Sequence, residues 1–187
     1  MFYIFALLFS PLGCCGLQLY CFGETVSIPF WTDSWTPSSF YDKIEANLER
    51  DMHTLCLLDI KVAERTVENM MKNRNIFEPP RFMSVSQAIE QLLKIKENIK
   101  KSGKIDEDTL AIGVARIGHN DQKLGEASIK IKFVKFYNVL YDSNSIPVSG
   151  KLKDLLTVDM GLPLHSLVIP GKMHEIEQNA IDYLKVE

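Results

Sequence analysis

The sequence contains little cysteine, and its cysteines are poorly placed for a metal centre or a disulfide framework. Only four occur in 187 residues, namely Cys14, Cys15, Cys21 and Cys56. Adjacent cysteines cannot readily bridge each other, and no second C-x-x-C pair exists to complete a tetrahedral zinc site. We therefore predict no metal and interpret the cysteines as buried thiols in a reducing compartment.

An excess of charge is lacking as well. The 21 basic and 24 acidic side chains leave a net charge of -3. This balance creates no field that would attract nucleic acid, so no nucleic-acid partner is predicted. With 46% hydrophobic and 24% charged residues, the chain has the composition of a soluble globule. Its length suits one domain, or one domain with an appendage.

Short catalytic motifs are also absent. The sequence has no G-x-G-x-x-G, Walker loop, G-x-S-x-G elbow or H-E-x-x-H. Asp33 lies between two tryptophans and could be a base in a pocket, although an aspartate that caps a turn is the more common arrangement. The four scattered histidines are more often structural than metal ligands. No catalytic residue follows from these patterns.

Charged residues are missing from the first 22 positions. Met1–Phe22 is mostly apolar and superficially resembles a signal peptide or a membrane span. It lacks the basic n-region of a signal, however, and Pro11, Gly13 and Gly16 interrupt a marginal span. We therefore expect a cytoplasmic protein without membrane contact, with a secreted or membrane-tethered protein as the alternative.

The most informative stretch that is present is TLCLLDIKV, residues 54–62. Its apolar run is too short for a solitary helix and is typical of a strand buried on both faces. Asp59 and Lys61 follow where the strand should leave the sheet. Because ligands of open α/β sheets lie beyond the carboxyl ends of strands, the corner at Leu58 is the first candidate site. A plain core strand is the alternative.

The remaining pattern alternates strands and helices and predicts an α/β fold. In the helix predicted at Glu64–Asn73, Val67, Met70 and Met71 are expected to face the core. A helix beginning at Ser84 has capping-box spacing to Gln87. Leu110–Gly118 is either a small-residue strand or a helix. The other predicted elements are a strand at Thr25–Phe30, a helix from about Phe40 to Arg50 with a capping box at Ser39 and Asp42, an extended connection at Ile76–Met83, a strand at Ile129–Tyr141, a strand at Leu164–Ile169 and a helix at Glu175–Lys185.

Several long strings resemble one family. They are GCCGLQLY from Gly13, FGETVSIPFWTDSWTPSSFYDKI, HTLCLLDIKV, IFEPPRFMSVSQA, ARIG and TVDMGLPLHSLVI. These strings resemble the carboxyl-terminal part of the eukaryotic diphthine synthase (diphthine methyl ester synthase) family. The resemblance runs from Gly13 to about Leu124 and resumes from near Gly150 to about Ile169.

The resemblance implies a mixed-sheet domain of a tetrapyrrole-methylase-like, two-domain methyltransferase. S-adenosyl-L-methionine would bind between the two domains, and the substrate would be the modified histidine of translation elongation factor 2 in diphthamide biosynthesis. A homodimer is a further expected partner. Carried over by position, the family's cofactor contacts fall on Leu58, Ile117 and His165. Leu58 and Ile117 have plain core residues as their alternative, and His165 could instead be a hydrogen-bonded residue that orients a loop.

The sequence departs from the family pattern in two places. The amino-terminal domain of the family is missing, and residues 126–149 have no counterpart. We therefore expect an apolar leader plus a remnant of the interdomain helix at residues 1–23, and a methyltransferase domain at 24–187 with an insertion at 126–149. Alone, such a chain should bind the cofactor poorly and be inactive. The alternative is a catalytically inactive fragment acting as an interaction domain, pairing through the former interdomain face or the strand at Ile129–Tyr141.

Overall fold

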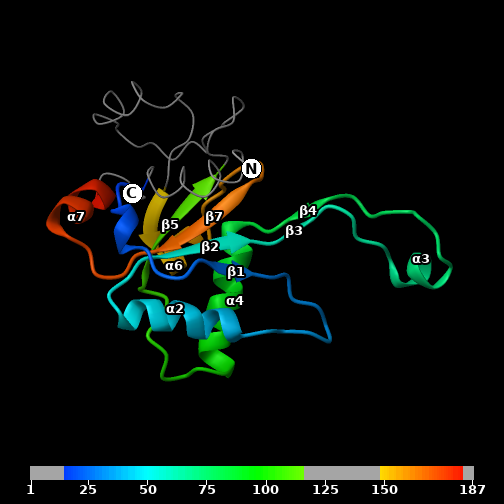
Figure 1. The fold of residues 1–187 in the computed structure, drawn as a ribbon, viewed down its shortest axis with the longest axis horizontal. Coiled ribbons are helices and arrows are strands. Elements are labelled where there is room, and N and C mark those ends of the chain that lie inside the picture. The colour runs from blue at the N-terminus through cyan, green and yellow to red at the C-terminus, as the bar shows by residue number, and fades with distance from the viewer. Residues whose placement is uncertain (1–14, 116–147, 183–187) are drawn as a thin grey trace.

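The computed structural model describes residues 15–115 and 148–182, which form a five-stranded sheet flanked by helices and a separate two-stranded ribbon (Figure 1). In chain order the elements are the 3-10 helix η1 (Leu19–Cys21), β1 (Val26–Ile28), α2 (Ser39–Glu49), β2 (Thr54–Leu58), β3 (Ile60–Lys61), α3 (Val67–Met71), β4 (Arg81–Phe82), α4 (Val85–Asn98), β5 (Leu110–Ala115), β6 (Val148–Lys151), α6 (Leu152–Leu155), β7 (His165–Ile169) and α7 (Glu175–Asp182).

The five strands form a mixed sheet in the order β1-β2-β7-β5-β6. β1 runs parallel to β2, whereas β7 is antiparallel to both β2 and β5, and β6 is antiparallel to β5. β2 is the buried strand predicted from the stretch TLCLLDIKV, and it ends at Leu58 as expected. The predicted α/β fold with a mixed sheet is therefore confirmed.

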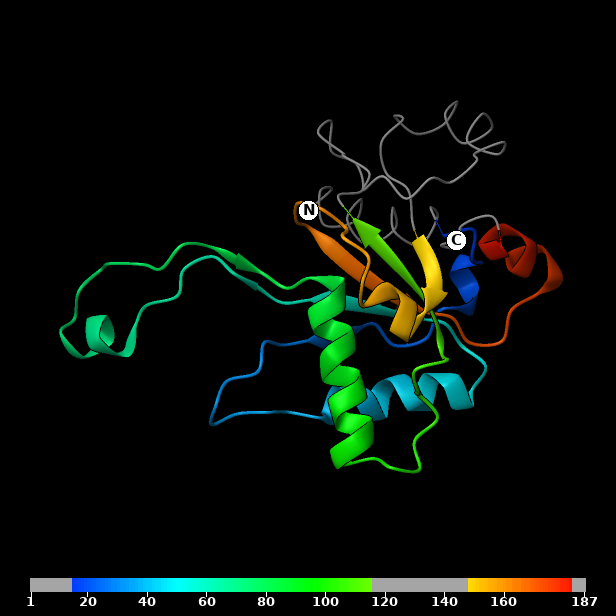
Figure 2. The same cartoon turned by 180° about the vertical axis from the view of Figure 1, so that it is seen from behind.

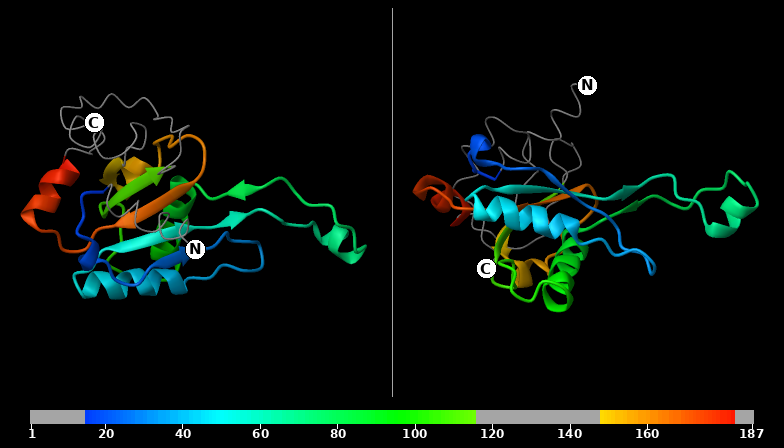
Figure 3. Two further views of the ribbon diagram at one scale, coloured as in Figure 1. Left: turned by 45° about the horizontal axis from the view of Figure 1, so that its top comes forward. Right: turned by 60° about the horizontal axis from the view of Figure 1, so that its bottom comes forward.

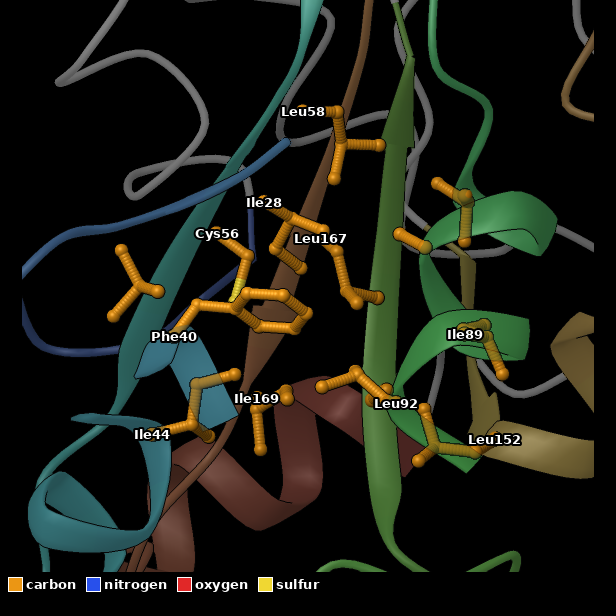
Figure 4. Close-up of a cluster of buried hydrophobic side chains, with 14 of the residues drawn as sticks. Ile28, Phe40, Ile44, Cys56, Leu58, Ile89, Leu92, Leu152, Leu167 and Ile169 are labelled. Atoms are coloured by element: carbon orange, nitrogen blue, oxygen red, sulfur yellow. The ribbon is translucent and has the colours of Figure 1, made fainter. Parts of the chain in front are cut away.

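Two hydrophobic cores lie on opposite faces of this sheet, because successive residues of a strand point to opposite sides. On one face, Cys56 and Leu58 of β2 pack with side chains from α2, α4 and α6 (Figure 4). On the other face, Leu55 packs with Cys15, Leu17 and residues of β5, β7 and α7. The strand is thus buried on both sides, which explains its uninterrupted apolar run.

The helix α4 lies in front of the sheet in Figure 2, which shows the molecule from behind, and it follows its sequence signals closely. The backbone N–H of Gln87 donates to the Ser84 hydroxyl at 3.2 Å, and the Ser84 N–H donates to the Gln87 side chain at 3.0 Å. This is the predicted capping box. The spacing of this helix predicts one apolar stripe of six residues, and five of them are buried, namely Val85, Ala88, Ile89, Leu92 and Ile95. The sixth, Ile99, is the C-cap and is 53% exposed.

Three predicted local features are wrong. The N-cap of α2 is Ser38, and it makes no side-chain capping bond. The helix around Met70 is shorter than predicted, and Val67, Met70 and Met71 are 68%, 51% and 82% exposed instead of facing the core. Spacing reveals which side chains share a helix face, but it cannot reveal whether anything packs on that face.

The other elements confirm most of the remaining predictions. Leu110–Ala115 is a strand, which decides between the two alternatives for that stretch, and the strand at His165–Ile169 is present. β6 and α6 were not predicted. In the described residues no helix is long and apolar enough to cross a membrane. The predicted strand at Ile129–Tyr141 lies outside the described residues.

Candidate functional site

The candidate site is the edge of the sheet at which β2 ends. Since β1, β2 and β5 run in one direction and β7 in the other, the carboxyl ends of the first three strands meet the amino end of β7 at one edge. We call this the Leu58 edge. It is the side of an open α/β sheet at which ligands usually bind.

The strand register brings two of the three predicted cofactor contacts together at the Leu58 edge. Leu57 pairs with Ser166, so Leu58 and His165 are the next residues along β2 and β7. On the other side of β7, His165 pairs with Ala115. Ile117 follows Ala115 by two residues but lies outside the described residues. Its place as a cofactor contact stays a prediction.

Leu58 and His165 differ in their surroundings. Leu58 is 7% exposed and belongs to the larger core, so it offers an apolar wall. By strand alternation His165 points to the same face as Leu167, which also belongs to that core. The ring is half-buried, and its Nε2 lies 3.0 Å from the carbonyl oxygen of Leu162. This bond holds the loop before β7.

Asp59 fixes the corner beside Leu58. Its backbone N–H donates to the carbonyl of Ile28 at 3.1 Å, and its carboxylate accepts the backbone N–H of Phe30 at 3.0 Å. Lys61 Nζ lies 3.4 Å from the same carboxylate oxygen. The corner therefore ties the end of β2 to the loop that follows β1, and this support is independent of any ligand.

The aromatic loop after β1 contains no buried acid. Thr32 and Trp35 form a tight turn through two backbone hydrogen bonds, and Asp33 is exposed within it. The Trp31 indole N–H donates to the Pro37 carbonyl at 3.2 Å. Asp33 is therefore an exposed turn residue, as the more common alternative predicts.

A second polar cluster, which the sequence analysis missed, lies between α7 and the amino-terminal segment. Potential ligand atoms of Cys21, His53 and Glu177 lie within 4.8 Å of one another. The Glu177 carboxylate accepts the N–H of Gln18 at 2.7 Å and that of His174 at 2.6 Å. Burial opposes its ionisation, but these hydrogen bonds and the one from His53 outweigh burial and hold the pKa of Glu177 below its ordinary value.

The hydrogen bonds of His53 make this cluster structural. The backbone N–H of Gly171 donates to His53 Nδ1 at 2.9 Å, so Nδ1 is unprotonated and Nε2 carries the proton. Nε2 then donates to Glu177 at 3.2 Å. A metal bound to Nε2 would require the ring proton to sit on Nδ1. That proton would then point at the Gly171 N–H, which is also a donor. The ring is therefore set up to donate to Glu177 and not to bind a metal.

Comparisons with known proteins agree with the resemblance of the strings. No family model matches the chain. It is 45% identical over 185 residues to the diphthine methyl ester synthase of Homo sapiens, an alignment that covers 97% of this chain and 57% of the relative. The Dictyostelium discoideum diphthine methyl ester synthase is 45% identical over 182 residues, covering 97% and 58%. The chain thus spans a little over half the length of these relatives.

These alignments extend further than the strings do. A share of 97% reaches into residues 1–12, which the strings leave unmatched. The division at residue 23 and the insertion at 126–149 stay predictions.

Solved structures support the same relationship. A structure from Entamoeba histolytica assigned to the diphthine synthases aligns with a TM-score of 0.73 at 40% identity, covering 96% of this chain and 57% of that one. A second diphthine synthase structure, at 21% identity and a TM-score of 0.59, shares the fold. By sequence and by fold, the chain is therefore a relative of the diphthine synthases that corresponds to a little over half of their length.

Proposed function

We propose that this chain is the carboxyl-terminal part of an S-adenosyl-L-methionine-dependent methyltransferase that methylates the modified histidine of translation elongation factor 2. The observation that carries the proposal is its 45% identity to diphthine methyl ester synthases over 97% of the chain. The diphthamide pathway also supports a cytoplasmic location. Because the chain spans only part of its relatives, the activity, the cofactor and the protein substrate all belong to this proposal.

The residues at the Leu58 edge suit an adenosine-containing cofactor. Such pockets are mostly apolar and carry a few polar groups that fix orientation. Leu58 supplies an apolar side chain, and His165 holds the loop at Leu162 beside it. We propose these two residues, with Ile117, as one wall of the cofactor site.

The sulfonium cofactor supplies an already activated methyl group. The protein can therefore contribute mainly by alignment, which can be worth roughly 7 to 11 kcal/mol when the reactants are well oriented. In this chain, the Asp59 corner and the His165–Leu162 bond are the contacts that fix the Leu58 edge. Transfer of an activated methyl group between aligned reactants requires no side-chain nucleophile.

Calorimetry with S-adenosyl-L-methionine tests the proposal. We expect weak binding to the chain alone, because it spans 57% of its human relative and each 1.4 kcal/mol of lost contact weakens binding about tenfold. Adding the amino-terminal half of that relative as a separate polypeptide should tighten binding and permit methyl transfer to elongation factor 2. Undetectable binding in both samples would contradict the proposal.

A matched pair of histidine variants tests the site itself. His165→Ala should weaken cofactor binding in the complemented sample about tenfold or more, since the loop at Leu162 loses its tether. His174→Ala removes an exposed ring at the start of α7 and should leave binding unchanged. Equal affinities for the two variants would remove His165 from the site.

A further inference from the structure

A short loop leads from α6 into β7 and reaches the sheet at the Leu58 edge. We call residues 159–164 the Asp159 loop; the structure describes all six, and none of them belongs to a helix or a strand. Figure 3 shows this segment, drawn in orange, at the end of the sheet where β2 ends. The loop stops directly before His165, so its shape decides how His165 enters β7.

One buried side chain anchors the loop on the sheet. Among the six residues Met160 alone is buried, and it belongs to the larger core. It packs on Gly113 of β5, where an added Cβ would lie only 3.2 Å from Met160 Cε. The glycine thus leaves room for the methionine close to the backbone of the strand. This contact fixes where the loop sits, but it does not fix which way the backbone turns beyond Met160.

Asp159 and Gly161 set that turn. The Asp159 carboxylate accepts the backbone N–H of Gly161 at 2.8 Å, as in the turns that aspartate commonly forms with the residue two positions further on. Gly161 has a φ of 71°, a left-handed conformation that glycine adopts without steric cost. Asp159 is exposed and takes no part in the core. Its hydrogen bond therefore shapes the loop without adding to the packing.

The turn directs the Leu162 carbonyl back towards His165. This carbonyl lies 3.0 Å from His165 Nε2, and because a carbonyl oxygen can only accept, Nε2 carries the proton. The Leu162 side chain is 67% exposed, so burial does little to hold this residue. The direction of its carbonyl then depends on the turn immediately before it. Two successive hydrogen bonds thus connect the Asp159 carboxylate to the His165 ring.

We propose that Asp159 is a positioning residue for the cofactor site, acting on His165 through Gly161 and the Leu162 carbonyl. The inference rests on the proposed function, in which His165 contacts S-adenosyl-L-methionine. A site gains affinity when its side chains are held in the bound geometry beforehand, because less conformational freedom is then lost on binding. Asp159 supplies this preorganisation through the loop and does not need to touch the cofactor.

A contribution to the stability of the fold is a weaker account of Asp159. A hydrogen bond at an exposed position adds little to the folded state, because water competes for the same groups. The negative charge is not required either, since an amide oxygen can accept the same N–H. If the role of Asp159 is to orient His165, asparagine should therefore replace it and alanine should not.

The first test is NMR spectroscopy of the full chain with isotope-labelled histidine. The N–H at Nε2 of His165 should give a signal, because its hydrogen bond slows exchange with water, and His165→Ala identifies this signal by removing it. Asp159→Ala should lose the signal, whereas Asp159→Asn should keep it. Gly161→Ala should also lose it, because an alanine disfavours a φ of 71°.

The matched control is Asp154→Ala, which removes another exposed aspartate, on α6. It should keep the His165 signal. Asp159→Ala and Asp154→Ala both change exposed positions, so both should keep a urea midpoint close to that of the parent chain. A His165 signal that persists unchanged in Asp159→Ala would overturn the proposal.

The second test measures S-adenosyl-L-methionine binding by calorimetry, in the sample complemented with the amino-terminal half of the human relative. Asp159→Ala should weaken binding about three- to tenfold, and Asp159→Asn and Asp154→Ala should bind like the parent. If Asp159 acts through His165, the double variant with Asp159→Ala and His165→Ala should bind no more weakly than His165→Ala alone.

Two calorimetric results would overturn the positioning role. One is an Asp159→Ala chain that loses the His165 signal yet binds the cofactor like the parent. The other is a double variant in which the two losses multiply, since Asp159 would then act independently of His165. If the parent itself binds no cofactor in either sample, the proposed function fails and this inference fails with it. The NMR signals, read on the chain alone, show separately whether Asp159 orients His165.

Discussion

Glu177 is the residue on which the cluster between α7 and the amino-terminal segment depends. Its two carboxylate oxygens accept N–H groups from Gln18, His53 and His174. Glu177→Gln turns one acceptor into a donor that faces these groups. We expect a loss of about 1–3 kcal/mol in unfolding free energy, measured with urea, because buried donors lose their acceptor. Glu175→Gln, an exposed charge change on the same helix, should cost almost nothing; a loss as large as that of Glu177→Gln would contradict this account.

The lowered pKa of Glu177 should also make the unfolding free energy depend on pH. The ordinary pKa of a glutamate is 4.5, and the folded protein holds that of Glu177 lower. The unfolded chain therefore takes up the proton first as pH falls. The contribution of Glu177 to the unfolding free energy is fully present above its pKa in the unfolded chain. It is lost as pH falls through its pKa in the folded protein. In urea titrations at successively lower pH, Glu177→Gln should lose stability less steeply than the parent chain below pH 4.5. Parallel slopes would exclude this role.

Cys56 should be unreactive in the folded protein. It is fully buried in β2, and burial raises the pKa of its thiol to about 12. Since the thiolate is the reactive form, alkylation at mildly alkaline pH should reach the half-buried Cys21 well before Cys56. Mass spectrometry of the two peptides measures the order. Equal labelling in urea is the control, and early labelling of Cys56 in the native chain would show that β2 opens.

At the scale of an element, α4 offers the clearest test of local sequence signals. Ser84→Ala removes the hydroxyl that accepts the Gln87 N–H, and loss of such a cap costs about 1 kcal/mol. Urea unfolding should show this loss, with no change for Ser102→Ala, which alters an exposed serine after the helix. A stability unchanged by Ser84→Ala would mean that packing of the apolar stripe alone sets the helix start.

Local signals explain why some elements could be predicted from sequence. The start of α4 and the end of β2 are determined by nearby residues, namely the Ser84–Gln87 box and the polar Asp59 after an apolar run. The environment of α3 was mispredicted because burial of Met70 depends on whether distant surfaces reach it. Short elements such as α6, with four residues, contain too few positions to show a period.

The candidate site, too, could be predicted only in part from the sequence. The apolar run predicts the corner at Leu58, but its closeness to His165 follows from strand pairing between distant parts of the chain. Family resemblance, and no local pattern, singled out His165. The His53–Glu177 pair joins residues 124 positions apart, and neither has a neighbouring motif, so no sequence signal could have found it.

At the scale of the whole molecule, the sheet and residues 60–82 should differ in local stability. The sheet strands are buried between two cores, whereas residues 60–82, which contain β3, α3 and β4, have no buried side chain. Amide hydrogen exchange reports this difference, because segments with few buried contacts open at low free-energy cost. Amides of residues 60–82 should exchange fast and those of β2 and β7 slowly. Exchange of residues 60–82 as slow as that of β2 would contradict this expectation.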